Sequence, residues 1–199
     1  MYKRYGFLGS IRLALCLIYT KIFYPSARLI RLPFDIRNRR YISIGKGFTT
    51  GVGCRIEAYP QSGKDKVLLF GDNIEINDYV HISAGEKIVI GNNVLIASKV
   101  FISDINHGNY TGIDQDNPMS IPNSRALSTK SIEIKDNVWI GEGVCIMSGV
   151  TIGFGCIIGA SSVVTKSIPD YCIAVGTPAK VIKKYDFEKN EWLPIKHDC

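Results

Sequence analysis

Aliphatic residues recur at intervals of six along much of the chain, and this pattern is the strongest structural signal in the sequence. In the C-terminal half the interval is unbroken, at Ile134, Ile140, Ile146, Ile152, Ile158 and Val164. A second apolar residue follows four positions after each of the first four, at Val138, Val144, Val150 and Cys156. An amphipathic helix would repeat at 3.6 residues and a single strand at 2, so neither element explains the pattern.

The same interval is present upstream, with one interruption. One run precedes the interruption and another follows it: Phe70, Ile76 and Ile82, then Ile90, Ile96 and Ile102. Glu86 lies inside the two-residue shift that separates the runs, and a weaker start is visible at Ile44, Thr50 and Ile56. Six residues make one short strand and one turn, and such units stack so that each coil buries its aliphatic side chains on the previous coil. We therefore predict an all-β solenoid.

The composition is that of an ordinary globular domain, with 46% hydrophobic and 21% charged residues among 199. These values exclude a disordered, collagen-like or multi-domain chain. The six cysteines form no C-x-x-C pair, and a chain of this length builds a core without disulfides. We read them as reduced thiols in a cytoplasmic protein.

Positive charge is concentrated at the N-terminus. Residues 1–40 contain nine cations against Asp35, a net charge of +8, so the remaining 159 residues carry −2 of the total of +6. A uniformly basic nucleic-acid-binding protein would not show this division, whereas a protein that meets an anionic surface with one end would. We predict no nucleic-acid partner.

An apolar run at residues 13–19, between Arg12 and Lys21, predicts a helix in this basic segment. The run is shorter than the roughly 20 residues that cross a bilayer, so we expect no single-span anchor. No small-x-small cleavage site follows it, which argues against a signal peptide. Two readings stay open: a helix that packs on the protein with its cations reaching water, or peripheral attachment to an anionic membrane surface.

Several motifs make the chain similar to one known family. Hexapeptides such as Ile140-Gly-Glu-Gly-Val-Cys145 resemble the hexapeptide-repeat acyltransferases over about residues 41–184. The stretch Ser103-Asp-Ile-Asn-His-Gly108, the ending Gly176-Thr-Pro-Ala-Lys-Val-Ile182 and the basic leader resemble the bacterial lipopolysaccharide O-antigen O-acetyltransferases in particular. The resemblance implies a left-handed parallel β-helix with three hexapeptides per coil. It also implies a homotrimer with active sites between neighbouring subunits.

The expected organisation has three parts. Residues 1–40 form a basic amphipathic N-terminal segment, residues 41–184 form the β-helix acyltransferase domain, and residues 185–199 form a short C-terminal tail. The repeat stops between Ile102 and Ile132, so residues 104–131 are expected to protrude from the solenoid as a catalytic loop.

His107 is the histidine of that loop, and it is the candidate general base. Acetyl transfer to a hydroxyl needs a group that takes the hydroxyl proton, and an imidazole titrating near neutrality suits this task. The resemblance assigns the catalytic role to the histidine of Asn106-His107-Gly108.

A base histidine needs a partner on its other nitrogen. Asp104 is the carboxylate that the family stretch offers, while Asp114, Asp116 and Glu142 are alternatives. Asp104 capping backbone amides of the loop is an equally good reading.

Two further residues were weighed for the acceptor side. The resemblance implies that Asn77, at a corner after Ile76, contacts the acceptor hydroxyl, although asparagine also suits a turn because it tolerates left-handed backbone. His81 faces outward and is more simply explained as an exposed solenoid side chain than as part of an acceptor groove.

The acyl donor implied by the resemblance is acetyl-CoA. Trp139 is expected to face outward beside the coenzyme arm, and turns at Ser148, Gly159 and Ala160 would offer backbone groups to the pantetheine amides. The phosphates would meet Lys166, Lys180 and Lys183, of which Lys180 gains most from the family match.

No metal is expected. A zinc site in this fold would need three convergent histidines, and the repeat region contains His81 and His107, 26 residues apart.

These observations predict an acetyl-CoA-dependent O-acetyltransferase that modifies a sugar hydroxyl of a cell-surface polysaccharide or its lipid-linked precursor. The basic leader would hold it at the inner face of the cytoplasmic membrane. An N-acetyltransferase acting on a nucleotide-linked amino sugar is the nearest alternative, and a non-catalytic β-solenoid scaffold is a more distant one.

Overall fold

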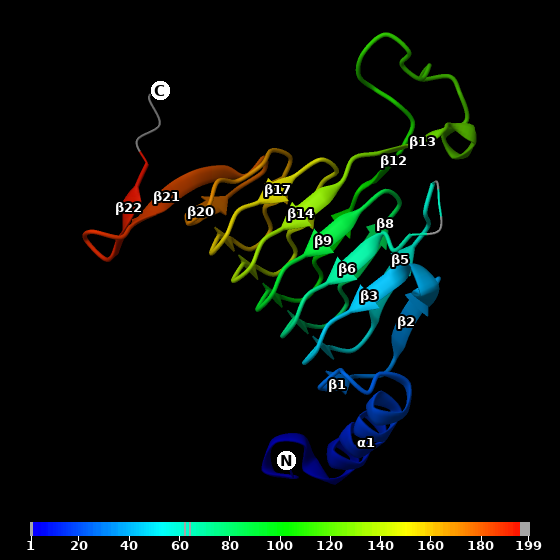
Figure 1. The fold of residues 1–199 in the computed structure, drawn as a ribbon, viewed down its shortest axis with the longest axis vertical. Helices are drawn as coiled ribbons and strands as arrows, with labels where there is room; N and C mark the ends of the chain where they lie inside the picture. The colour runs from blue at the N-terminus through cyan, green and yellow to red at the C-terminus, as the bar shows by residue number, and fades with distance from the viewer. Residues whose placement is uncertain (1, 62, 64, 196–199) are drawn as a thin grey trace.

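The computed structural model describes residues 2–61, 63 and 65–195, and its main body is a solenoid of short parallel strands (Figure 1). Complete coils give one strand to each of three sheets, in the chain order sheet C, sheet A, sheet B. The predicted all-β parallel solenoid is confirmed at this level.

The strands are short, as the six-residue repeat requires. Sheet A contains β1 (Leu29–Ile30), β4 (Thr49–Thr50), β7 (Glu75–Ile76), β10 (Leu95–Ile96), β15 (Trp139–Ile140), β18 (Ile157–Ile158), β20 (Cys172–Val175), β21 (Lys180–Asp186) and β22 (Glu191–Pro194). Sheet B contains β2 (Phe34–Arg37), β5 (Cys54–Ala58), β8 (His81–Ala84), β11 (Phe101–Ser103), β16 (Cys145–Ile146) and β19 (Val163–Val164). Sheet C contains β3 (Ile42–Ile44), β6 (Leu68–Phe70), β9 (Ile88–Ile90), β14 (Ile132–Ile134) and β17 (Thr151–Ile152).

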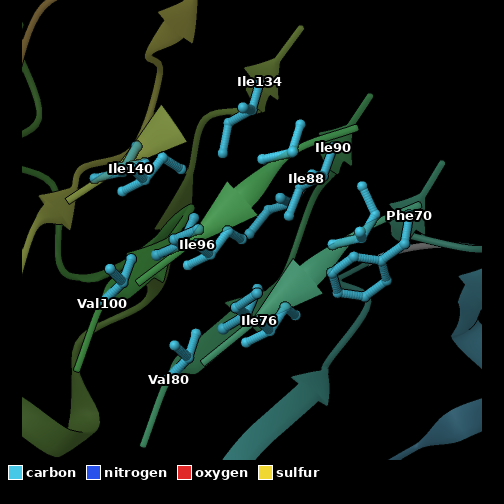
Figure 2. Close-up of a cluster of buried hydrophobic side chains, with 14 of the residues drawn as sticks. Phe70, Ile76, Val80, Ile88, Ile90, Ile96, Val100, Ile134 and Ile140 are labelled. Atoms are coloured by element: carbon cyan, nitrogen blue, oxygen red, sulfur yellow. The ribbon is translucent and has the colours of Figure 1, made fainter. Parts of the chain in front are cut away.

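The six-residue pattern forms the core. Each of its residues from Phe70 to Val164 is at most 4% exposed. The parallel register places identical positions above one another, so that Ile96 pairs with Ile76 on one side and with Ile140 on the other. Figure 2 shows these side chains stacked inside the coils. Because each coil buries its aliphatic residues on its neighbours, the core is continuous along the solenoid axis.

Asparagines make the corners between sheet C and sheet A. Asn73, Asn93 and Asn137 have φ of 56°, 55° and 59°, a left-handed conformation that asparagine adopts more readily than most residues. Their side-chain amides form a ladder, with Nδ2 to Oδ1 distances of 3.2 and 3.1 Å between successive coils. The turn residues therefore stabilise the same stacking that the core stabilises.

Helix α1 (Tyr2–Phe23) covers the N-terminal end of the solenoid and is kinked at Gly6, which has φ 66° (Figure 1). The residues of α1 that are buried are Cys16 and Thr20. The Thr20 hydroxyl accepts a hydrogen bond from the Ile30 backbone at 2.8 Å, which ties the helix to β1.

The ground for expecting no single-span anchor, a short apolar run, needs correction. Residues Tyr5–Phe23 form a helix of 19 residues with a mean hydropathy of 1.5, long and apolar enough to cross a membrane by length and composition. The sequence reading stopped the apolar run at Arg12 and Lys21. The helix continues past both, because single cations among apolar residues do not end a helix.

The C-terminal residues described here are not a loose tail. Strand β21 returns antiparallel to β20, and β22 pairs with β21 from Asp186–Glu191 to Lys183–Pro194. This hairpin extends sheet A at the far end of the solenoid (Figure 1).

The interrupted repeat at residues 104–131 forms a protrusion. Its base is an antiparallel pair, β12 (Ile105–His107) with β13 (Leu127–Thr129), and a short 3-10 helix, η2 (Pro122–Ser124), lies between them. Another 3-10 turn, η1 (Arg39–Tyr41), precedes β3. In Figure 1 the protrusion leaves the solenoid at the edge between sheets B and C.

Candidate active site

A groove of about 320 Å³ lies where the protrusion leaves sheet B. Its floor is the outward face of β5, β8 and β11, and its wall is the β12–β13 hairpin. The lining residues are Glu57, Tyr59, His81, Ser83, Phe101, Ser103, Ile105, His107 and Leu127. Its volume lies within the range of small-molecule sites, which makes it the candidate active site.

The parallel register sets the chemistry of the groove floor. One outward row reads Arg55, His81 and Phe101, and the next row reads Glu57, Ser83 and Ser103. The second row lies beside the protrusion, and its residues are 6 to 9% exposed. A hydrophobic solenoid thus carries a row of buried polar side chains at this one place.

His107 lies in the groove wall with an exposed side chain, at the end of β12 where it pairs with Leu127. Its backbone is fixed on both sides. The neighbouring Asn106 donates its side-chain amide to the Ser148 hydroxyl at 2.8 Å, and the Tyr110 hydroxyl donates to the His107 carbonyl. Within the described part of the chain the imidazole makes no hydrogen bond or ion pair, so both ring nitrogens are available to substrate.

Asp104 does not hold His107, and this corrects the first expectation for the orienting carboxylate. The Asp104 side chain is fully buried and accepts backbone hydrogen bonds from Gly85 at 2.6 Å, Glu86 at 2.9 Å and Lys87 at 2.8 Å. Burial raises the pKa of its carboxyl group, and the three backbone hydrogen bonds act in the opposite direction. Asp104 is therefore an anchor of the coil below, at the two-residue shift in the repeat.

The other three candidates for the carboxylate that orients His107 do not bond to it either. Asp116 accepts a hydrogen bond from the Asn109 backbone at 2.7 Å, and Glu142 pairs with Lys99 at 3.2 Å. The Asp114 side chain makes no hydrogen bond or ion pair among the described residues. None of the three contacts the imidazole of His107.

The carboxylate and histidine pair that the groove does contain is Glu57 with His81, which the sequence reading did not assign. Glu57 Oε1 lies 2.9 Å from His81 Nε2, and the carboxylate is 8% exposed. Arg37 approaches the other carboxylate oxygen at 3.3 Å. The six-residue repeat shows that His81 faces outward. It does not show that Glu57 lies near His81, because the residues between β5 and β6 do not keep the interval of six.

Asn77 lies at the opposite edge of sheet B from His107. It follows β7 at the corner between sheets A and B, whereas His107 follows β11 at the corner between sheets B and C. One chain therefore does not bring these two predicted acceptor residues together.

Four of the predicted cofactor residues lie along the edge between sheets A and B. Trp139 is 49% exposed and pairs with Ile157, two residues before the Gly159–Ala160 turn. Lys180 opens β21 opposite Val175, and a Cβ on Gly159 would lie 2.7 Å from a Val175 methyl.

The remaining three lie elsewhere. Ser148 and the exposed Lys166 belong to the edge between sheets B and C, where Ser148 bonds Asn106. Lys183 pairs with Ile173 on the face of sheet A. Four of the seven expected cofactor residues thus form one group at the edge between sheets A and B, and Ser148 instead supports the strand of His107.

In the described ranges, no group of three or more His, Cys, Asp or Glu side chains is arranged to hold a metal ion. The five cysteines from Cys16 to Cys172 are free, and Cys199 lies outside the described residues. Burial raises the pKa of the Cys156 thiol to about 11, which makes it a poor nucleophile at neutral pH.

Comparison with known proteins supports the sequence resemblance. The family described as bacterial transferase hexapeptide (six repeats) matches residues 131–166. The chain is 45% identical over 194 residues to WbbJ of Escherichia coli (strain K12), named as a candidate lipopolysaccharide biosynthesis O-acetyl transferase; the match covers 96% of this chain and 95% of WbbJ.

Solved structures agree on the fold. A mutant of AntD, an N-acyltransferase from Bacillus cereus in complex with dTDP-4-amino-4,6-dideoxyglucose and coenzyme A, superimposes with a TM-score of 0.68 at 26% identity, covering 86% of this chain and 90% of that chain. A hexapeptide-repeat acetyltransferase from Vibrio cholerae complexed with acetyl coenzyme A gives a TM-score of 0.53 at 26% identity, covering 76% of this chain and 70% of that one.

Proposed function

Since this chain belongs to the family of hexapeptide-repeat acyltransferases, we propose that it is an O-acetyltransferase acting on a sugar hydroxyl of a cell-surface polysaccharide or its lipid-linked precursor. The enzyme is a coenzyme A-dependent acetyltransferase. The observation that carries the finer proposal is the similarity to WbbJ along 96% of this chain, which includes the N-terminal helix and the protrusion with His107.

His107 is the general base in this proposal. Its imidazole lies in the wall of the groove and has no hydrogen-bond partner among the described residues, so an unprotonated ring nitrogen can take the proton of an acceptor hydroxyl as that oxygen attacks the thioester carbonyl carbon of acetyl-CoA. The new oxygen–carbon bond replaces the sulfur–carbon bond, and the departing coenzyme A thiolate receives the proton from the imidazolium. Acetyl-CoA supplies the thioester acyl group when bound. Backbone N–H groups at a coil corner would stabilise the developing oxyanion, and each typically lowers the activation free energy by ~3 kcal/mol.

The residues at the edge between sheets A and B fit the acyl donor. The coenzyme has an extended arm with amide groups and an adenine ring with phosphates. Trp139 gives an exposed aromatic surface, and Lys180 adds a cation at the end of the edge. The backbone groups of Gly159 are engaged by the Ala174 carbonyl and the Ser162 hydroxyl, so the exposed Ala160 is the residue of this turn that would offer its backbone to the coenzyme arm.

The separation of Asn77 from His107 supports a homotrimer. Two residues at opposite edges of one sheet can meet at a shared site when the neighbouring subunit supplies one of them. We include the trimer, with coils wound left-handed as in the family, in the proposal; analytical ultracentrifugation of the intact protein tests the subunit number.

The test of activity is thiol release from acetyl-CoA with a panel of lipid-linked and soluble glycans that contain hydroxyl or amino sugars. The wild type should release thiol with at least one hydroxyl acceptor, and His107→Ala should lower turnover by about 10²–10⁴-fold. Asp114→Ala, an exposed change in the same protrusion, is the matched control and should retain activity. Unchanged turnover in His107→Ala would remove His107 as the base.

An N-acyltransferase is the second candidate, because AntD superimposes over 86% of this chain and was solved with an amino sugar on a nucleotide. The same panel separates the two activities, since thiol release with nucleotide-linked amino sugars and none with hydroxyl acceptors would favour N-transfer. No release with any acceptor, together with no binding of acetyl-CoA, would favour a scaffold.

The proposal includes attachment to the inner face of the cytoplasmic membrane through α1. A row of large apolar residues at spacings of three and four faces away from the protein: Leu8, Ile11, Leu15, Ile18 and Ile22, which are 44 to 79% exposed. The face that packs on the solenoid includes the buried Cys16 and Thr20 and the partly buried Tyr19. Such an outward apolar row is costly in water and favourable in a lipid interface.

Vesicle sedimentation tests the attachment. The full-length protein should sediment with vesicles that contain phosphatidylglycerol, while a Leu15→Glu/Ile18→Glu variant should stay in the supernatant with unchanged thiol-release activity on a soluble acceptor. Extraction by alkaline carbonate separates a peripheral helix, which is released, from a spanning helix, which is retained. Equal sedimentation of the variant and the wild type would exclude α1 as the attachment site.

A further inference from the structure

The groove contains a histidine that is oriented by a carboxylate, and it is His81 rather than His107. Glu57 Oε1 lies 2.9 Å from His81 Nε2, and Arg55 Nη2 lies 2.9 Å from the same nitrogen. A carboxylate only accepts hydrogen bonds and a guanidinium only donates them, so Nε2 cannot serve both. The tautomer of His81 therefore depends on whether Nε2 bonds Glu57 or Arg55.

We assign a hydrogen to His81 Nε2, which donates it to Glu57. An unprotonated Nε2 would set its lone pair against those of a carboxylate that is 8% exposed. Arg55 has another acceptor, since its Nη2 also lies 3.5 Å from Glu57 Oε1. The same Nη2 lies 3.3 Å from His81 Nδ1. With Nε2–H donated to Glu57, Nδ1 is the acceptor nitrogen of the ring, and an acceptor hydroxyl bound there takes the place of this long contact with Arg55 Nη2.

Ser83 gives the groove floor a second polar group. Its side chain is 9% exposed and follows His81 by two residues on β8, so both face the groove. Its hydroxyl makes no hydrogen bond within the described residues, whereas the adjacent Ser103 hydroxyl accepts one from the Ile105 backbone at 3.2 Å. The Ser83 hydroxyl is not fully enclosed, because the buried side-chain polar atom without a partner among the described residues is Arg55 Nε; the Ser83 hydroxyl can therefore bond water or a ligand that enters the groove.

Phe101 adds an apolar ring to the groove floor beside His81. Its ring centroid lies 5.3 Å from that of His81, and both line the groove. An apolar ring beside hydrogen-bonding groups matches a pyranose, which has a C–H face and a rim of hydroxyls. The groove wall carries His107, so a sugar held on this floor presents a hydroxyl to the base.

We propose that His81 and Ser83 form a hydroxyl-binding subsite, which holds a second hydroxyl of the acceptor sugar and so selects the hydroxyl presented to His107. Glu57 is a positioning residue that acts through His81. The ligand class is a pyranose with free hydroxyls next to the acetylated position. This inference rests on the proposed sugar O-acetyltransferase function and adds to it the residues that choose the acceptor.

Steady-state kinetics of the full-length enzyme with the responding acceptor test the subsite. Ser83→Ala and His81→Ala should raise the acceptor KM by about 10-fold or more, because each removes a hydrogen bond to a buried polar group. The kcat at saturating acceptor and the Kd of acetyl-CoA should change by less than about 3-fold. Glu57→Gln should resemble His81→Ala and add little to it in the double variant.

Deoxy acceptors separate binding from a structural role. An acceptor that lacks the neighbouring hydroxyl should be a poorer substrate for the wild type but should lose little further activity in Ser83→Ala. Equal penalties for both acceptors, or a fall in kcat with unchanged KM, would overturn the subsite. Thermal denaturation of each variant shows whether the fold is retained.

Sugar binding is also measured directly, by saturation-transfer NMR with the free acceptor sugars. Binding to the wild type that weakens in Ser83→Ala, without any acetyl transfer, would support the subsite while the proposed function fails. Transfer that depends on His107 but is insensitive to changes at His81 and Ser83 would do the reverse. The absence of sugar binding to the wild type would overturn the subsite.

Discussion

Replacing Asp104 distinguishes a structural anchor from a catalytic carboxylate. In the structure Asp104 Oδ1 accepts the Gly85 amide, and Oδ2 accepts the amides of Glu86 and Lys87. Asp104→Ala leaves three backbone N–H groups without their acceptor. The Gly85 amide is buried and cannot turn to water, while Glu86 and Lys87 are exposed residues whose amides water can reach in part.

The magnitude follows from this division. One buried amide without a partner costs about 1–3 kcal/mol, and each partly hydrated amide loses about 0.5–1 kcal/mol of net hydrogen bonding. Removing the buried carboxylate also removes its desolvation cost, which offsets part of the free energy lost with the three hydrogen bonds. We expect Asp104→Ala to lower the free energy of unfolding by about 2–4 kcal/mol, and Asp104→Asn, which keeps one acceptor oxygen, by about 1–2 kcal/mol.

Denaturant unfolding and hydrogen exchange make the measurement. The amides of Gly85, Glu86 and Lys87 should exchange faster in Asp104→Ala than in the wild type. Asp114→Ala, whose side chain has no partner among the described residues, should stay within about 0.5 kcal/mol of the wild type. At a temperature where Asp104→Asn stays folded, its kcat should stay within about 3-fold of the wild-type value, since its side chain does not contact His107.

The pH dependence has a defined sign. Burial raises the pKa of Asp104 above its ordinary value, so between the two values the folded state holds a proton that the unfolded state has released. This pH-dependent part of the contribution of Asp104 to stability is therefore present below the ordinary pKa and lost as the pH rises through the folded pKa, while the hydrogen bonds to the three amides contribute on both sides of it. The stability advantage of the wild type over Asp104→Asn should grow as the pH is lowered through this window. A large loss of kcat in a stable Asp104→Asn enzyme would refute the anchor assignment.

Three further outcomes are expected. Ile96→Ala, at a fully buried core position, should lower the free energy of unfolding by about 2–5 kcal/mol in denaturant titration, and a loss under 1 kcal/mol would contradict the continuous core. Trp139→Ala should weaken binding of coenzyme A by about 10-fold in calorimetry with little loss of stability, because half of its side chain is exposed; unchanged affinity would remove it from the donor site. Asn106→Ala should lower kcat by about 10-fold without unfolding the protein, since it frees β12 from Ser148, and adding Ser148→Ala should cause little further loss.

The solenoid was predictable because its signal is local and repeated. Each six-residue unit specifies an inward position and a turn, and the parallel register places units such as Ile76, Ile96 and Ile140 on one another. The place where the repeat stops was equally readable, and it correctly located the protrusion that carries His107.

The partners of individual side chains were not predictable in the same way. Asp104 is three residues from His107 in sequence but bonds a coil 17 to 19 residues earlier. Glu57 bonds His81 on the next coil, and the number of residues between β5 and β6 breaks the count of six. The helix at the N-terminus was recognised, but the direction of its apolar side chains depended on how it packs.

The sequence by itself thus determined the architecture, the family and the histidine of the protrusion, because a short-range repeat and a motif of adjacent residues carry that information. Only the tertiary structure decided that Asp104 anchors a coil, that His81 and Ser83 share the groove with His107, and that α1 leaves a row of large apolar side chains exposed. Those facts depend on which residues of neighbouring coils lie next to one another. The number of residues in each corner sets that register, and it has no signature in any single segment.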